Sequence, residues 1–191
     1  MMKNIVFCVL MLVSGAAFSK AVCNGQTNAE LTSCAQTNYE ASDKILNKSY
    51  NDFMGKLTAS DRQSLIATQR AWVAYKEKYC GAAFDATAPG AEAAIDKLAC
   101  LTSVTEARTE EIRYLGSAIG MDIFRRSLTV MANLYENGDT GKVITKLIKN
   151  TSDGDNPNWV KYVALNCKMT AAKLHEERDA CTARLNFFKN W

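Results

Sequence analysis

The sequence predicts an all-α fold, a disulfide-linked antiparallel helical bundle, and three observations carry that prediction. Only two prolines occur in 191 residues, Pro89 and Pro157. Apolar residues recur at helical spacings, whereas the strict alternation of a half-buried β-strand is hard to find. Six cysteines follow the first 21 residues, and an even number in an exported chain is typical of a disulfide framework.

Residues 1–21 are interpreted as a cleaved secretory signal peptide. Residues 1–4 form a short basic start, residues 5–18 are almost entirely apolar, and small residues then surround the expected cleavage site. The apolar run is too short for a membrane span, and no other segment is apolar enough for one. The residues before Cys23 match a lipid-attachment site poorly. We therefore expect a soluble mature protein that is periplasmic or secreted and begins near Val22.

The first long helix is expected over roughly Ser33–Leu57, where apolar side chains form one stripe. Its start is open, because both Ser33 and Thr27 begin a capping-box pattern. After a turn of three residues, Ser60 begins a stronger capping-box pattern, and a second helical stripe follows directly. Two helices joined by so short a turn are expected to be antiparallel neighbours.

A loop is expected from Phe84 to Ala91, with Pro89–Gly90 as its breaker. A third helix follows from about Ala91 to Leu115. These three helices complete a first domain, residues 22–118.

Shorter helices are expected in the remaining region, residues 119–191. Asp122 is the expected N-cap of one helix, which Asn137–Gly138 stops. The next helix is expected over Gly141–Lys149. A polar loop, Thr151–Asn158, then leads into the last part of the chain.

A Trp-Val-x-Tyr pattern occurs twice, at Trp72–Tyr75 and at Trp159–Tyr162, and each Trp has a cysteine eight residues after it. On a helix these three positions lie near one face. We therefore expect Trp72, Tyr75, Trp159 and Tyr162 in the core, and two related helical units of which the second is shortened. The alternative role for the tryptophans, as sugar-stacking platforms, is rarer on amphipathic helices.

A second cysteine follows each copy of the pattern, which predicts the disulfides Cys80–Cys100 and Cys167–Cys181 and leaves Cys23–Cys34 as the third pair. A continuous helix would hold Cys167 and Cys181 roughly 20 Å apart, beyond the reach of a disulfide. Either the chain turns around Leu174–Glu177 or this pairing is wrong. We favour the turn, because the first copy also breaks between its two cysteines.

Nothing in the sequence indicates catalysis, a metal or a cofactor. The single histidine, His175, lies in a charged run, and the pairs Glu110–Glu111 and Glu176–Glu177 are expected to be solvated. There is no Cys-x-x-Cys, and the acidic residues of 153–156 lack the spacing and the closing Glu of a calcium loop. The net charge of +3 is not gathered into a basic stripe for nucleic acid. We expect a protein that is not an enzyme, has no catalytic or metal-binding residues and binds no nucleic acid.

One series of residues resembles the LprI-type lysozyme-inhibitor domain, namely Gln69–Trp72, Tyr75, Cys80, Cys100–Thr102 and Glu106–Thr109. The likeness covers about Val22–Leu115. The second region shares only Trp159, Tyr162, Cys167, Cys181 and Arg184 with the pattern. The resemblance implies a small, exported, disulfide-linked helical module without catalytic activity.

The resemblance also implies a protein partner, a lysozyme or another peptidoglycan hydrolase. The protein would then serve as a defence against lysozyme or as an immunity protein against a delivered toxin. The alternative is an envelope accessory module with a different partner. The expected contact residues lie in the loop whose ends a Cys80–Cys100 disulfide would pin, and they are Phe84, Asp85, Thr87 and Pro89. Thr151–Asn158 is the competing loop.

Overall fold

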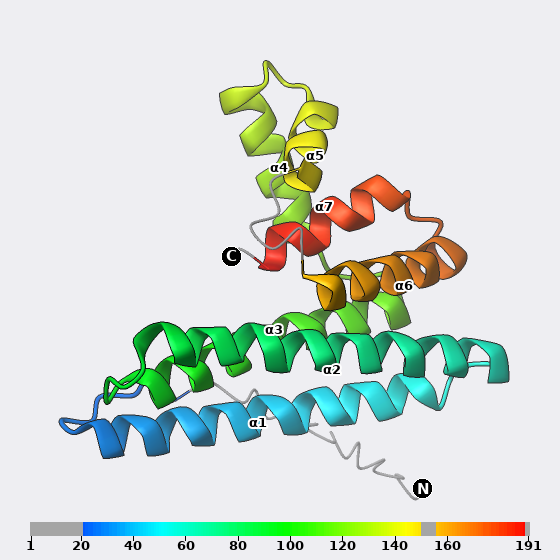
Figure 1. Ribbon diagram of the computed structural model, residues 1–191. Coiled ribbons are helices and arrows are strands. Elements are labelled where there is room, and N and C mark those ends of the chain that lie inside the picture. The colour runs from blue at the N-terminus through cyan, green and yellow to red at the C-terminus, as the bar shows by residue number, and fades with distance from the viewer. Residues whose placement is uncertain (1–20, 150–155, 190–191) are drawn as a thin grey trace, which may run out of the picture.

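The computed structural model describes residues 21–149 and 156–189, and these form seven α-helices and no strand (Figure 1). The predicted all-α fold is therefore confirmed. Almost all of the expected signal peptide, residues 1–20, and most of the loop Thr151–Asn158 lie outside the described residues. None of the described helices combines the length and the apolar character needed to cross a bilayer.

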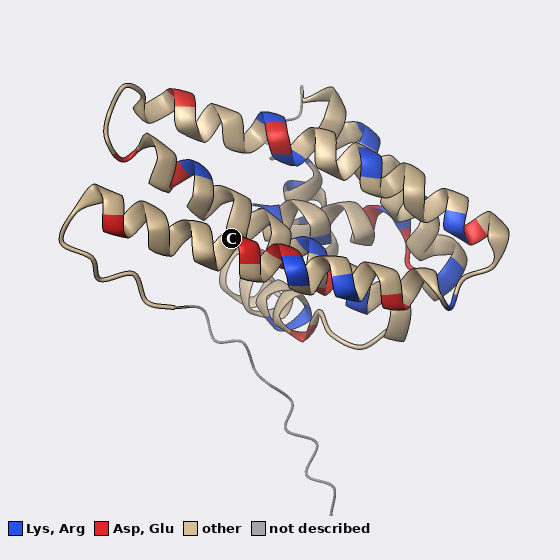
Figure 2. Ribbon diagram, turned by 90° about the horizontal axis from the view of Figure 1, so that it is seen from below, with Lys and Arg blue, Asp and Glu red and all other residues tan. Residues whose placement is uncertain are grey.

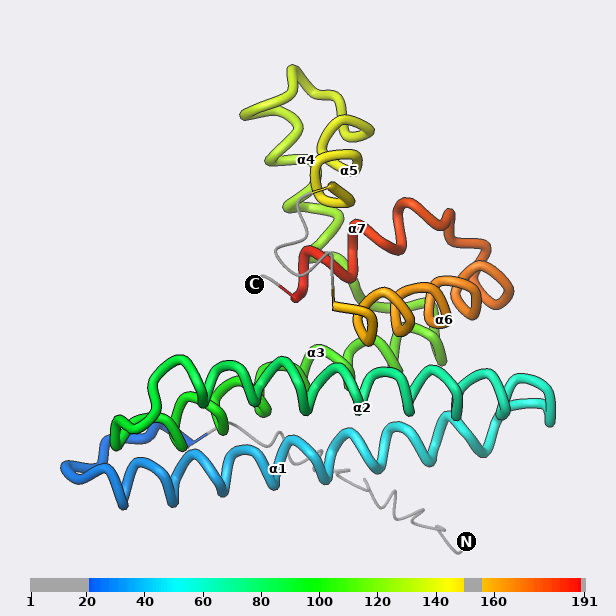
Figure 3. Tube along the Cα trace, viewed as in Figure 1, coloured from blue at the N-terminus to red at the C-terminus, as the bar shows by residue number. Residues whose placement is uncertain are grey.

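Three long helices form the base of the molecule: α1 (Asn28–Met54), α2 (Ala59–Thr87) and α3 (Ala93–Ser117) (Figures 1 and 3). Helices α1 and α2 run antiparallel, as expected, but within the base each packs mainly against α3 rather than against the other, and α2 also packs extensively against α6. The base of the molecule is therefore organised around α3. Basic and acidic residues are interspersed along the long helices, without a stripe of one sign (Figure 2).

The capping patterns of the first two helices are resolved by hydrogen bonds. Helix α1 begins after Thr27, whose Oγ1 accepts from the Glu30 backbone N–H at 3.2 Å, while the Glu30 carboxylate accepts from the Thr27 N–H at 3.1 Å. Helix α2 begins after Thr58, whose Oγ1 accepts from the Asp61 N–H at 3.2 Å. The prediction of Ser60 as its cap is therefore wrong, because the equivalent bond already forms two residues earlier.

The predicted loop Phe84–Ala91 is too long. Helix α2 continues to Thr87, and the Ala88 N–H still donates to the Phe84 carbonyl at 2.9 Å. The helix ends at Ala88, which is extended (ψ 142°), because a residue before proline is disfavoured in the α conformation. The alanines of this stretch favour the helix up to that point.

Helices α4 (Asp122–Tyr135) and α5 (Thr140–Lys149) form a hairpin that stands away from the long helices (Figure 1). Asp122 is the first residue of α4 rather than its N-cap, a position that Met121 occupies with a left-handed φ of 61°. Helix α4 ends before Asn137 and Gly138, as predicted, and both residues have positive φ angles.

Helix α6 (Pro157–Leu174) packs against α2, and α7 (Arg178–Lys189) returns over α6 (Figures 1 and 3). The chain reverses at His175, whose φ is 54°. The reversal brings the Cα atoms of Cys167 and Cys181 to 5.7 Å. The predicted turn between these cysteines is thus confirmed.

The two Trp-Val-x-Tyr patterns meet in the main core, where α2 packs against α6. Trp72, Tyr75, Trp159 and Tyr162 are all 5% exposed or less. Val73, the second residue of the first pattern, is 41% exposed. A smaller cluster, formed around Phe124, Ala183 and Phe187, attaches the α4–α5 hairpin to α7. Whether the two halves are related units stays a prediction.

Candidate functional site

One end of the three-helix base is held by two disulfides. Cys80–Cys100 joins the last turns of α2 to the first turns of α3, with Cα atoms 5.5 Å apart. Cys23–Cys34 ties the segment before α1 to that helix, with Cα atoms 5.7 Å apart. The start of α1 and the α2–α3 connection lie at the same end of the molecule (Figure 1). All three disulfides join the expected pairs.

The expected contact residues lie at this end, although not all in a loop. Phe84, Asp85 and Thr87 belong to the last turn of α2, and only Pro89 lies in the connection to α3. Phe84 is 39% exposed, which is high for a large apolar side chain, and Asp85 and Pro89 are exposed as well. The Thr87 Oγ1 is within hydrogen-bond distance of the Ala83 carbonyl at 3.4 Å. A helix end that a disulfide ties to the next helix presents these side chains on a rigid support.

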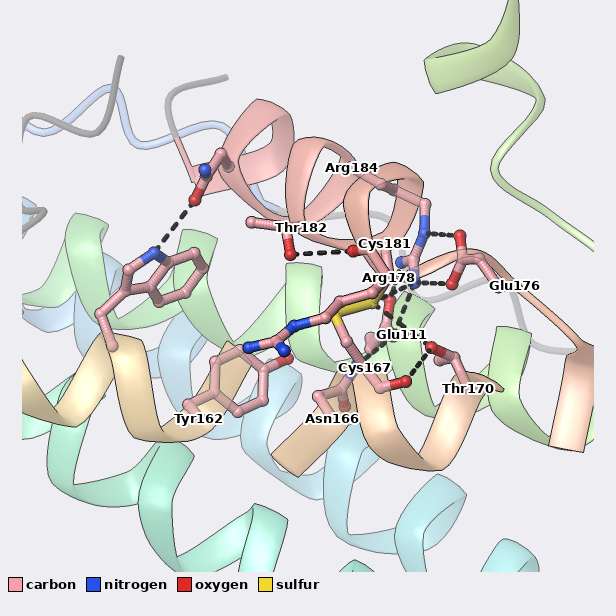
Figure 4. Close-up of a disulfide and its surroundings, with 12 residues drawn as sticks. Glu111, Tyr162, Asn166, Cys167, Thr170, Glu176, Arg178, Cys181, Thr182 and Arg184 are labelled. Carbon is pink, nitrogen blue, oxygen red and sulfur yellow. Dashed lines mark hydrogen bonds and ion pairs between the residues drawn. A yellow bond between two sulfur atoms is a disulfide. The ribbon is translucent and has the colours of Figure 1, made fainter. Parts of the chain in front are cut away.

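A second polar feature is buried where α3 meets α6 and α7 (Figure 4). Both guanidinium Nη atoms of Arg184 donate to Glu111, and its Nε and Nη2 donate to Glu176 at 2.8 Å. Asn166 Nδ2 donates to Glu111 at 2.6 Å. Glu111 is 2% exposed, so the expectation that it is solvated is wrong. Its neighbour Glu110 is exposed, as expected.

The network continues through Arg108 on α3. Its Nε donates to Gln69 Oε1 at 2.9 Å, and its Nη1 donates to Asn166 Oδ1 at 2.8 Å and to Tyr162 Oη at 3.2 Å. Burial raises the pKa of Tyr162, against the opposing charge of Arg108. Burial by itself lowers the pKa of Arg184, but the charges of Glu111 and Glu176 outweigh it and raise the pKa above its usual value. Arg184 therefore stays charged, and the hydrogen bonds of both arginines hold α3 to the C-terminal helices.

The acids of this network are bound to arginines, and the only histidine of the sequence, His175, is exposed at the end of α6. Within residues 21–149 and 156–189, no group of three or more His, Cys, Asp or Glu side chains is placed to hold a metal ion. The acidic residues of the rejected calcium loop lie mainly outside these ranges.

Most residues that carry the family resemblance are internal. Gln69 and Arg108 bond to each other inside the protein, Trp72 and Tyr75 are in the core, and Cys80 is in a disulfide. These residues of the pattern therefore contribute to the interior of the domain. Sequence reasoning missed the role of Glu111, because an acid in a run of charges looks like its exposed neighbours.

Comparison with known proteins agrees with the sequence pattern. A family model described as "Lysozyme inhibitor LprI" matches residues 20–112. An uncharacterized protein of Rhizobium meliloti (strain 1021) is 30% identical over 100 residues, which covers 45% of this chain and 71% of the relative. No solved structure matches the chain.

Proposed function

Because this chain belongs to the LprI family of lysozyme inhibitors through residues 20–112, we propose that it is an exported inhibitor that binds a peptidoglycan hydrolase and blocks its activity. The family match is the observation that carries this proposal. The disulfides are consistent with export, because such bonds persist in oxidising compartments. The proposal includes removal of residues 1–21, so that the mature protein begins at Val22.

The proposed contact surface is the end of the base that carries Phe84, Asp85 and Pro89. An exposed aromatic side chain on a braced helix end loses little conformational entropy on binding, which suits a group that enters a cleft. Asp85 adds a negative charge beside it. Lysozyme-type enzymes bind an extended substrate in such a cleft, so occupation of the cleft would exclude the substrate.

The direct test is inhibition of cell-wall lysis by the purified, oxidised protein, measured against a panel of lysozymes and other peptidoglycan hydrolases. Inhibition of at least one enzyme, rising with inhibitor concentration, is expected. Inhibition confined to hydrolases that rival cells deliver would indicate an immunity role. If no hydrolase is bound or inhibited, the alternative of an envelope accessory module replaces this proposal.

The contact surface is tested with the inhibited enzyme by a Phe84→Ala/Asp85→Ala variant. Alanine keeps the last turn of α2 helical, and both cysteines of the nearby disulfide remain. We expect affinity to fall about tenfold or more, as for an aromatic residue central to an interface. The matched control is Lys56→Ala, an exposed substitution in the connection between α1 and α2, which lies at the opposite end of the base (Figure 1). Equal affinity of the two variants would remove this end from the interface.

A further inference from the structure

A pocket of about 780 Å³ lies where α2 and α3 meet α6, α7 and the start of α4. Neither Phe84 nor Asp85 lines it, although the preceding residues of α2, Ala82 and Ala83, do. The volume falls within the roughly 300–1,000 Å³ that is typical of small-molecule sites. Its wall combines small aliphatic residues with a group of aromatic side chains: Trp72, Tyr75, Tyr79, Trp159, Tyr162 and Phe188.

The acidic residues of this lining form ion pairs, whereas two of its arginines do not. Its acids each pair with a cation outside the lining: Glu110 with Arg113, Glu111 with Arg184, and Asp122 with Arg125. Arg108 and Arg126 also line the pocket, and neither forms an ion pair with another described residue. The wall therefore carries positive charge that the described part of the protein does not balance directly.

Arg108 shows this imbalance in its hydrogen bonds. The side chain is 1% exposed, and its Nε and Nη1 are bonded to neutral partners. Its Nη2 has no hydrogen-bond partner within residues 21–149 and 156–189. A buried cationic donor without an acceptor is costly, and a negatively charged oxygen nearby would offset that cost. Lys189 also lines the pocket, and its Nζ lies 5.1 Å from the centre of the Trp159 ring.

We propose that this pocket binds a small amphipathic carboxylate, a ligand with an apolar body and one acidic group. The body packs against the aromatic wall and is removed from water there. The carboxylate lies toward Arg108, and Arg126 contributes to its attraction. A cationic ligand of the same shape is repelled by these two arginines, and a neutral one leaves the charge of Arg108 unmatched.

The experiment uses the full chain in its oxidised form and three probes with the same alkyl chain: decanoate, decanol and decyltrimethylammonium. Their binding is followed by displacement of the fluorescent anion anilinonaphthalene sulfonate. Decanoate is expected to bind about tenfold more tightly than either other probe, which corresponds to one charge-assisted hydrogen bond. Equal affinity for the three probes, or a preference for the cation, would overturn the proposal.

Substitutions in the lining test whether decanoate binds in this pocket. Arg108→Gln and Arg126→Gln should each weaken decanoate more than decanol, and Ala107→Trp should fill the pocket and abolish binding of both. Arg126 is exposed, so its substitution keeps the test valid if Arg108→Gln fails to fold. Arg178→Gln, on α7 outside the lining, removes an arginine as a control and should change nothing. Undiminished decanoate binding by a folded Ala107→Trp or Arg126→Gln variant would place the ligand elsewhere and refute the site.

Discussion

The ring centroids of Tyr75 and Trp159 lie 4.6 Å apart, and this contact joins the two Trp-Val-x-Tyr patterns where α2 packs against α6. Trp159 also lies 5.4 Å from Tyr162, and its Nε1 donates to Asn186 Oδ1 at 3.0 Å. The two occurrences of the pattern are thus halves of one aromatic core. Each supplies the apolar surface against which the other is buried.

Truncation of either tryptophan should therefore destabilise the whole protein. Trp72→Ala and Trp159→Ala are each expected to lower the free energy of unfolding by about 3–5 kcal/mol, as for other buried aromatic side chains. The matched controls are the adjacent valines, because Val73 is 41% and Val160 is 52% exposed. Val73→Ala and Val160→Ala should change the free energy by about 0.5 kcal/mol or less. Urea denaturation measures the stability of all four variants. A stable Trp72→Ala protein that had lost only partner binding would reassign Trp72 to a binding role.

Arg184→Met should cost about 3–5 kcal/mol, since it removes the cation that pairs with the buried Glu111 carboxylate, whereas Glu111→Leu should cost less, since Arg184 keeps its ion pair with Glu176. Glu111→Leu and Arg184→Met are the single variants, and the double variant should cost clearly less than their sum. Glu110→Gln, which breaks an exposed pair with Arg113, should cost less than about 1 kcal/mol. Additive single effects in the double-mutant cycle would mean that the two side chains are not coupled.

The disulfides should contribute strongly to stability, at roughly 3 kcal/mol each for closed loops of this size. Cys80–Cys100 spans 20 residues and Cys23–Cys34 spans 11. Replacing the first pair by alanines should therefore cost about 0.5 kcal/mol more than replacing the second. Calorimetry of both variants, with and without reductant, measures this difference in stability. An unchanged melting temperature on reduction would contradict the prediction.

The cysteines should all be oxidised in the mature protein. Intact mass after alkylation should show no free thiol before reduction.

Stability should fall in strongly alkaline solution because of Tyr162. Burial raises its pKa above the ordinary value of 10.0. The hydroxyl thus keeps its proton in the folded state at pH values where the unfolded chain has lost it. The stability that the buried, protonated Tyr162 contributes is fully present below pH 10.0. It is lost as the pH rises through the pKa of Tyr162 in the folded state.

Brief urea titrations at increasing pH, with tyrosinate absorbance recorded in parallel, would show this loss. Tyr162→Phe should be less stable at neutral pH, because it loses the bond from Arg108, but should show a weaker alkaline decline. An identical decline in both proteins would assign the effect to other groups, such as Tyr50 and Tyr114, whose pKa values burial also raises.

Local features of the sequence determined the fold class, the disulfide pairs and much of the core. Apolar periodicity and the scarcity of proline are properties of the chain itself, so the helices follow from them. The turn at His175 follows from a distance argument once Cys167 and Cys181 are taken as a pair, because a disulfide cannot span a continuous helix of that length. The sequence did not determine the first residues of the helices, since several side chains near each start are able to cap a helix: Thr27, Ser33, Thr58 and Ser60.

Only the tertiary structure decided which charged residues are buried and where the pocket lies. Glu110 and Glu111 are adjacent acids on α3, yet one faces water and the other faces Arg184, 73 residues away. A helix turns each successive side chain by about 100°, so the elements that pack on α3 determine the environment of each acid. Arg108 likewise depends on Gln69 from α2 and Asn166 from α6. Such environments arise from contacts between distant segments, which the spacing of residues along one helix does not encode.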